Sequence, residues 1–387
     1  MSNIRRAMMG SAGSTSAGGN VGTLWGWGEN SQGAIGDGSS TDRSSPVQIG
    51  SNTNWQIVDL DDYGSWKYSA AGDSTMAIDE DGKLFTWGRG GNGQLGHGNT
   101  TQYSSPVQVG SLTDWATCTG GYETWATKTD NTWWHVGGTN SYGQAGQGDT
   151  TAYSSPVQIG SATYWIKCSG NYRTAFAITN HGSDTSGQLW SVGYGGQGQL
   201  GTGSTTSVSS PAQIGSLETW TLVNQGWFAV VALRSDGALF TWGYNASGQL
   251  GDGTTTNRSS PVQIGTTEWS YAEMGYKDNV LAVKTDGTLW TWGKNDKGQL
   301  GLGDTTNRSS PVQVGSLTDW KVTSAPNWVG ASVKTDGTLW TWGDGANGLT
   351  AQGNTTSISS PAQVGSDTDW ISVGNSQSNV MHGIRSA

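Results

Sequence analysis

The sequence predicts an all-β protein made of seven repeated units, and one recurring phrase is the main reason. The phrase Ser-Ser-Pro-Val/Ala-Gln-Ile/Val-Gly occurs seven times in 387 residues, with its proline at Pro46, Pro106, Pro156, Pro211, Pro261, Pro311 and Pro361. Consecutive prolines are 60, 50, 55, 50, 50 and 50 residues apart. A period near 50 residues is typical of an array whose units bury their apolar faces only against one another.

Each unit is predicted to contain four short strands. The segment Leu-Trp-Thr-Trp at 289–292 alternates with a period of two, as a strand does. Asp-Gly pairs beginning at 81, 236, 286 and 336 separate two β-rich runs, which indicates tight hairpins whose glycine has a positive φ. Seven units of four local strands predict a seven-bladed β-propeller over residues 21–387, preceded by a flexible, Gly/Ser-rich arm at residues 1–20.

The phase of the repeats predicts how the ring closes. The chain enters with the third and fourth strands of a unit, at 24–27 and 46–49, and leaves with the first and second, at 370–373 and 380–384. We therefore expect the N- and C-terminal strands to share one blade. Such a blade removes the open sheet edges that an unclosed array exposes.

Tryptophan is expected to supply the core. Of 22 tryptophans, 17 occupy three repeat positions, one after the proline phrase and two in segments such as Trp290-Thr-Trp292. Burial of each ring removes about 150–250 Å² from water, or roughly 4–6 kcal/mol at about 25 cal/mol/Å². Cys118 and Cys168 occupy one repeat slot and are expected to be small buried side chains, with a disulfide as the alternative.

Composition excludes several classes of partner. The net charge is −10 and the pI is near 4.7, which argues against binding to nucleic acid or to an anionic membrane. No stretch approaches the roughly 18 apolar residues of a membrane span. The first 20 residues lack the apolar segment of a conventional secretory signal.

Two motifs resemble a known repeat. Gly-Gln-Leu-Gly-x-Gly followed by Pro-Val, with Leu-Trp-x-Trp-Gly upstream, is similar to the repeat of the regulator of chromosome condensation (RCC1) family, and the similarity extends over residues 21–387. It implies a seven-bladed propeller whose termini share a blade. The eukaryotic founders are exchange factors for a small GTPase and have Gly-x-His-Thr-Leu-Ala in the second strand. Here the segments starting at Gly121 and Gly275 lack that histidine, so no exchange residue is carried over.

The chain offers no recognisable catalytic or metal-binding motif. Its histidines, His97, His135, His181 and His382, occupy different repeat positions, and no Cys/His cluster has zinc spacing. Acidic segments near Asp59 and Asp79 contain only part of a calcium loop. We expect a non-enzymatic protein without metal or cofactor.

Candidate binding residues lie where the repeats differ. The loop between the first and second strands presents an aromatic residue in most units: Tyr122, Tyr172, Trp227, Tyr276 and Trp328. These residues are predicted to surround the central channel and to bind a protein or a sugar, unless they fill the gaps between blades. An insertion of about ten residues in the first unit adds Tyr63 and Trp66, as a second binding surface or as a packed cover.

The N-terminal arm suggests an anchor. Its Ile4, Arg5, Arg6, Met8 and Met9 precede a Gly/Ser spacer, and this start is similar to the starts of structural proteins of tailed phages. The first hypothesis is therefore a virion or cell-surface display propeller. The arm would bind other structural proteins of the assembly, and one propeller face would bind a host-surface protein or glycan. The alternatives are a cytoplasmic RCC1-like regulator of a small GTPase and a carbohydrate-binding propeller.

Overall fold

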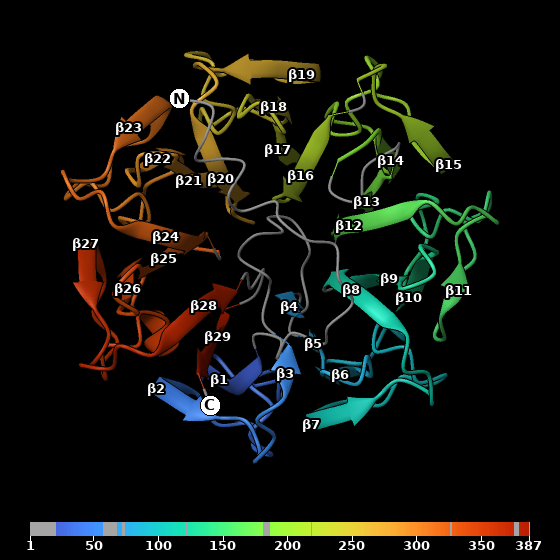
Figure 1. Cartoon of the computed structure of the whole chain (residues 1–387), viewed down its shortest axis with the longest axis horizontal. Coiled ribbons are helices and arrows are strands. Elements are labelled where there is room, and N and C mark those ends of the chain that lie inside the picture. Colours follow the sequence, from blue (N-terminus) through green and yellow to red (C-terminus); the bar gives the residue numbers. More distant parts are fainter. Residues whose placement is uncertain are drawn as a thin grey trace, which may run out of the picture.

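Seven antiparallel sheets surround a central axis like the blades of a propeller (Figure 1). The structure is a computed structural model that describes residues 21–56, 68–71, 74–120, 122–180, 186–217, 219–325, 327–374 and 379–386. The predicted fold class and the four strands per blade are confirmed within these residues. Among them, no helix is of a length and apolarity that would cross a bilayer.

The strands follow the repeat. The closing blade contains β1 (Val21–Gly28), β2 (Arg43–Gln48), β28 (Trp370–Gly374) and β29 (Val380–Ser386), and β3 (Trp55–Gln56) also pairs with β1. Three blades then contain β4 (Tyr68–Ala71), β5 (Ser74–Ile78), β6 (Leu84–Gly88) and β7 (Tyr103–Gln108); β8 (Trp115–Gly120), β9 (Glu123–Lys128), β10 (Trp133–Gly138) and β11 (Val157–Gln158); and β12 (Trp165–Asn171), β13 (Thr174–Thr179), β14 (Leu189–Gly193) and β15 (Val208–Gln213). The last three contain β16 (Trp220–Gln225), β17 (Ala229–Arg234), β18 (Leu239–Gly243) and β19 (Arg258–Ile264); β20 (Trp269–Met274), β21 (Asn279–Lys284), β22 (Leu289–Gly293) and β23 (Arg308–Gln313); and β24 (Trp320–Ser324), β25 (Val329–Lys334), β26 (Leu339–Gly343) and β27 (Ile358–Gln363), with a short 3-10 turn η1 (Ala346–Gly348) before β27.

The two ends of the chain close the ring, as predicted. β1 pairs antiparallel with β29 over seven residue pairs, from Gly22 opposite Ser386 to Gly28 opposite Val380. In Figure 1 the blue β1 and β2 therefore share a blade with the red β28 and β29. The sheet order β2-β1-β29-β28 places the C-terminal strands on the inner side and the N-terminal strands on the outer side.

The hairpins between the second and third strands adopt the predicted conformation. Gly82, Gly237, Gly287 and Gly337 have φ values of 74°, 82°, 80° and 79°. At Gly287 a Cβ atom would lie 2.1 Å from the carbonyl oxygen of Thr318 in the next blade. Glycine is thus required both by the left-handed backbone and by the close approach of the neighbouring blade.

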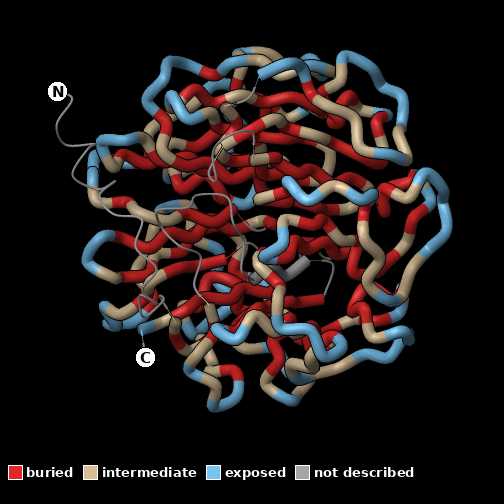
Figure 2. Tube along the Cα trace, turned by 45° about the vertical axis from the view of Figure 1, so that its right-hand side comes forward, coloured by how far each residue is buried: buried red, intermediate tan, exposed pale blue. Residues whose placement is uncertain are grey.

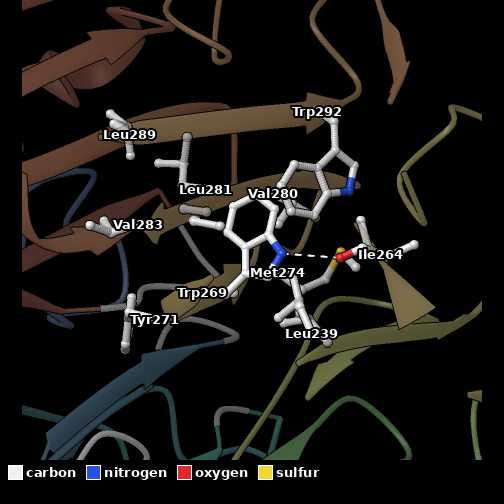
Figure 3. Close-up of a cluster of buried hydrophobic side chains, with 14 of the residues drawn as sticks. Leu239, Ile264, Trp269, Tyr271, Met274, Val280, Leu281, Val283, Leu289 and Trp292 are labelled. Carbon is white, nitrogen blue, oxygen red and sulfur yellow. Dashed lines mark hydrogen bonds between the residues drawn. The ribbon is translucent and has the colours of Figure 1, made fainter. Parts of the chain in front are cut away.

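The core lies between adjacent blades, where buried strands face one another, while exposure concentrates in the turns (Figure 2). Figure 3 shows one such region, in which Trp269 and Trp292 pack with Leu239, Ile264 and other apolar side chains. The Trp269 indole N–H donates to the Ile264 carbonyl at 3.0 Å. The Trp292 indole N–H donates to the Gln249 carbonyl of the preceding blade, also at 3.0 Å. These tryptophans fill the core and also link neighbouring blades.

The expectation that all 17 repeat tryptophans belong to the core is wrong for one repeat position. In the Trp-x-Trp strands the second ring is fully buried, as in Trp292 and Trp342, whereas the first ring is only half-buried, as in Trp290 and Trp340. Because side chains two residues apart lie on the same face of a strand, both rings contact the same neighbour, as Trp290 and Trp292 both contact Trp269. The first ring packs at the margin of the core and reaches the rim of the ring.

The two cysteines match the predicted small buried side chains. Cys118 and Cys168 are 0% and 1% exposed, and they are not joined by a disulfide. The Cys168 sulfur lies 3.5 Å from the Thr117 hydroxyl oxygen. Burial raises the pKa of the Cys168 thiol to about 12, so the thiol stays protonated.

Candidate functional site

The loops between the first and second strands all reach the same face of the propeller. In the blades of Tyr172, Tyr276 and Trp328, the loop is held there by a backbone hydrogen bond from the residue that follows the third strand of its own blade. Tyr194 N donates to Arg173 O at 2.8 Å, Lys294 N to Asp278 O at 2.8 Å, and Asp344 N to Trp328 O at 3.0 Å. Because these loops occur at the same position in each repeat, the loops of successive blades lie on a common surface.

On that face the five predicted aromatic residues come from five consecutive blades. The ring centroids of Tyr122 and Tyr172 are 5.4 Å apart, and those of Tyr172 and Trp227 are 6.1 Å apart. Trp227 and Tyr276 are stacked, with centroids 5.3 Å apart and an interplanar angle of 14°. Trp328 joins them through the Lys277 ammonium, which lies 5.6 Å from its ring centroid and 4.9 Å from that of Tyr276. We call these five residues the aromatic arc.

A second row of rings supports the arc. Phe228 stacks on Trp227 with centroids 5.3 Å apart and an interplanar angle of 17°. Tyr194 lies 5.7 Å from Phe228 and 4.8 Å from Tyr142. Tyr276 is 8% exposed, while the other four rings of the arc are half-buried. The arc thus packs between blades, as the alternative expects, and also leaves aromatic surface exposed to solvent, while its binding role stays a prediction.

Three cations lie against the aromatic rings. The Arg173 guanidinium lies 4.2 Å from the Tyr172 centroid and 4.8 Å from that of Tyr142. The Lys277 ammonium is 4.9 Å from the Trp227 centroid, and the Lys294 ammonium is 4.5 Å from that of Trp328. Burial and the nearby Lys294 charge lower the pKa of Lys277. This face therefore presents positive charge in a protein whose net charge is −10.

Two loops of this face hold a left-handed backbone without glycine. Arg173 has a φ of 68° and Asp278 a φ of 65°. Such conformations raise the free energy of the folded state for residues with a Cβ. They persist where the surrounding structure enforces them, often at functional sites. Here the enforced turn places the cation Arg173, and the cation Lys277 next to Asp278, against the aromatic rings.

A buried carboxylate fixes the Arg173 loop. Glu123 is 1% exposed and accepts hydrogen bonds from the Thr139 hydroxyl, from the Gln144 amide at 3.1 Å and from the Arg173 backbone N–H at 3.4 Å. Burial raises the pKa of Glu123 against these stabilising contacts. Since Arg173 belongs to the next blade, Glu123 holds two adjacent loops of the arc in register.

A second buried carboxylate joins two further blades. Glu273 is 0% exposed, and its Oε1 accepts from Ala325 N at 2.9 Å and from the Ser324 hydroxyl at 3.1 Å. Its Oε2 accepts from the Tyr271 hydroxyl at 3.1 Å. Burial raises the pKa of Glu273 to about 7.

Asp278, beside Lys277, is also perturbed. Burial raises its pKa to about 6, although the nearby Lys294 charge and a hydrogen bond with Gln249 oppose that shift. Burial therefore raises the pKa of both Glu273 and Asp278 toward neutrality.

The sequence identified the aromatic residues of the arc but missed its cations and its second row. Arg173 and Lys277 directly follow an arc aromatic, and that adjacency was the available signal. Tyr142, Tyr194 and Lys294 lie in other loops and meet the arc only through the fold. Tyr63 and Trp66, together with Ile4, Arg5, Arg6, Met8 and Met9 of the arm, lie outside the described residues, so their proposed roles stay predictions.

The arc combines aromatic rings with cationic side chains. Aromatic rings and arginine side chains are the groups that most often anchor a partner at a protein interface. Within the described part of the chain, no three His, Cys, Asp or Glu side chains gather as a set of metal ligands. His135 and His382 are buried, and burial lowers the pKa of the former to about 3 and of the latter to about 4.

Comparison with known families agrees with the fold. The model of the regulator of chromosome condensation (RCC1) repeat matches residues 21–76, 81–124, 186–233, 236–277 and 286–325, which is more than half of the chain. The protein therefore belongs to the RCC1 repeat family. Propellers of this family are a binding or regulatory type of domain.

Known relatives share short segments of sequence or the whole fold. The ultraviolet-B receptor UVR8 of Arabidopsis thaliana is 35% identical over 91 residues, which are 24% of this chain and 19% of the receptor. Human WBSCR16 superposes with a TM-score of 0.79 at 17% identity, over 94% of this chain and 99% of that protein. Yeast RCC1 (Prp20), solved with Kap60 bound, gives 0.77 at 16% identity, over 97% and 95% of the two chains. This chain thus spans about a fifth of the receptor, and the structural likeness concerns the fold.

Proposed function

We propose that this protein is an RCC1-type regulatory propeller that binds a protein partner through the aromatic arc. The observation that supports this best is the junction of five loops from consecutive blades into one surface of rings and cations. The repeat keeps its turns constant elsewhere, so variable side chains that meet on one face favour a binding role. The family also includes yeast RCC1, whose solved structure contains Kap60 as a protein partner.

A protein suits the arc better than a sugar does. A sugar needs an open aromatic face, whereas Trp227 is already stacked with both Phe228 and Tyr276. Lys277 and Lys294 lie over the rings of Trp227 and Trp328. A protein surface with carboxylates and apolar side chains complements such a mixture of ring edges and positive charge.

The comparisons favour the regulator over the display hypothesis. None of the relatives described above is named as a virion component, and one of them is yeast RCC1 itself. A small GTPase is the partner that the regulator hypothesis names. The family histidine of the second strand is absent here, so we propose binding and not an exchange reaction.

The test is affinity capture from a lysate of the source organism, read by mass spectrometry. The baits are the wild type, the double variant Tyr172→Ala/Trp227→Ala and the control Tyr164→Ala, whose ring is 45% exposed and lies outside the arc. We expect a partner that the wild type and the control retain and that the double variant loses, with all three baits still folded at the temperature of the assay. A partner retained equally by the double variant would contradict the proposal.

A fourth bait lacking residues 1–20 separates the two main hypotheses. Under the regulator hypothesis this bait retains the same partner as the full chain. Capsid or tail proteins that are captured only by the full chain would instead support the display hypothesis, with the arm as its anchor.

A further inference from the structure

Grooves at the rim of the ring recur with the repeat. One groove of about 530 Å³ lies between β19 and the neighbouring strands β22 and β23. A second groove of about 390 Å³ lies one blade further on, beside β23, β26 and β27. Both volumes are in the range of small-molecule sites, roughly 300–1,000 Å³. The grooves share no residue with the arc.

The two grooves are built from the same repeat positions. Each is lined by the half-buried tryptophan of a Trp-x-Trp strand, the tryptophan after the proline phrase, a glutamine and a Ser-Pro pair. In the larger groove these are Trp290, Trp269, Gln263, Ser310 and Pro311. In the smaller groove they are Trp340, Trp320, Gln313, Ser360 and Pro361. The coincidence shows that the groove is a product of the repeat.

In the sequence, the other five repeats have the same residue types at these positions. The position of Trp290 is occupied there by another large aromatic residue: Trp25, Phe85, Trp134, Trp190 or Phe240. The glutamine of the phrase is present in all seven repeats, as are its Ser-Pro residues. The repeat therefore places one aromatic residue, one amide and one hydroxyl at each of the seven blade junctions.

The tryptophan in each groove is held in a fixed orientation. The Trp340 indole N–H donates to the Thr338 hydroxyl at 2.9 Å, and the Lys334 ammonium lies 4.4 Å from the ring centroid. Lys334 is itself buried, with a side chain only 7% exposed, and is paired with Asp319 at 3.5 Å. Trp290 has the same contacts with Thr288 and Lys284. A fixed ring loses little conformational freedom when a ligand packs against it.

The lining of the smaller groove is uncharged, and the two charged residues that line the larger groove are both paired, Asp252 with Arg258 at 2.7 Å and Lys284 with Glu268 at 3.1 Å. Besides Trp320 and Trp340, it consists of glycine, leucine, valine, glutamine, serine and proline residues. An uncharged lining favours a neutral ligand, because an ionic group would be desolvated there without a counter-charge. A pyranose ring has an apolar C–H face that packs on an indole and hydroxyl groups that pair with an amide and a serine. The combination of indole, glutamine and serine matches that chemistry.

We propose that the rim grooves at Trp290 and Trp340 each bind one pyranose unit of a neutral glycan. The repetition of the groove makes the ring multivalent, so a surface with closely spaced glycans binds more tightly than a single sugar does. This site is independent of the arc, and it holds whether or not the arc binds a protein.

The experiment has two stages, both with the full chain. An array of neutral and acidic glycans first selects the neutral sugar that the wild type retains. Calorimetric titration with the methyl glycoside of that sugar then gives the number of sugars bound per chain. We expect more than one, with a loss of two sites in Trp290→Ala/Trp340→Ala and no loss in Tyr244→Ala, a half-buried aromatic residue outside the grooves. On the array, the double variant should bind about tenfold or more weakly, equivalent to about 1.4 kcal/mol.

A milder variant tests the same grooves in case the double tryptophan variant does not fold. Gln313→Ala removes the amide from one groove and keeps both tryptophans, and it is expected to remove one site while the melting temperature stays unchanged. Three results would overturn the proposal. They are an array without any retained neutral glycan, an unchanged number of sites in the folded double variant, and binding of a proline-rich peptide in the grooves without binding of sugar.

Discussion

The two faces of this propeller differ in what the repeat controls. On one face, the hairpins between the second and third strands have nearly the same form in successive blades, as Gly237, Gly287 and Gly337 show with φ values of 82°, 80° and 79°. On the other face, the loops between the first and second strands differ in sequence and gather the aromatic arc with its cations. The uniform face maintains the ring, and the variable face provides the candidate binding surface. Changes in the first should therefore reduce stability, and changes in the second should reduce binding.

The largest expected effect is in the core that supports both faces. Trp292→Ala should lower the free energy of unfolding by about 3–5 kcal/mol, since it leaves a large cavity and removes the hydrogen bond to Gln249 of the preceding blade. Its neighbour provides the control, because Trp290 is half-buried. Trp290→Ala should cost about 2 kcal/mol or less. Urea denaturation measures both, and equal losses would contradict the division between core and rim.

A smaller effect is expected at the uniform face. Gly287→Ala combines a positive φ with a Cβ atom only 2.1 Å from the Thr318 carbonyl oxygen, so we expect a loss of about 2–3 kcal/mol. Gly315→Ala is the matched control, with a φ of 59° and open space around its Cβ, and it should cost only about 1 kcal/mol. The same denaturation experiment applies. If the two variants are equally stable, the hairpin does not depend on contact with the next blade.

The third prediction concerns pH and the buried Glu273. Burial raises its pKa in the folded state to about 7, from an ordinary value of 4.5. The folded protein retains this proton at a pH at which the unfolded chain has released it, so stability must fall as the pH rises from about 4.5 to 7. The variant Glu273→Gln lacks this titration. The stability of the wild type relative to the variant should decline over that interval and stay constant above it, which thermal melting at several pH values would show. A constant difference throughout would mean that Glu273 is ionised in the folded protein.

The smallest effect on stability, with a clear effect on binding, is expected in the arc. Lys277→Gln removes the ammonium group that lies over Trp227, Tyr276 and Trp328. A partly exposed cation–ring contact contributes about 0.5–1 kcal/mol, so stability should change little. Affinity for the captured partner should weaken and become less dependent on salt, since one interfacial charge is lost. An unchanged salt dependence would indicate that Lys277 faces away from the partner.

The fold was predictable because the same strand and turn pattern occurs seven times in the sequence. The period, the alternation in 289–292 and the Asp-Gly hairpins each depend on local chemistry, and ring closure follows from the phase of the units. The partition of the tryptophans was not predicted, since Trp290 and Trp292 are both compatible with burial in sequence. The two rings differ only in their position along one strand, since Trp290 lies nearer to the hairpin at Gly287, and the difference in their burial appears only in the folded ring.

The candidate site was predictable in part. Its aromatic residues share a position in the repeat, and a shared position implies a shared face. The cations against them were missed because their contacts join different blades, as between Lys277 and Trp328. The burial of Glu123 and Glu273 was likewise not expected, since acidic side chains are mostly exposed and each accepts a hydrogen bond from a backbone N–H about 50 residues away.

The most direct test of the central claim is hydrogen–deuterium exchange of the protein with and without its captured partner. We predict slower exchange at residues 171–173, 226–228 and 276–278, in the loops of the aromatic arc. Exchange at the hairpin turns 235–238 and 285–288 on the opposite face should remain unchanged. Protection of those hairpins, with no change in the arc loops, would contradict the assignment of the binding face.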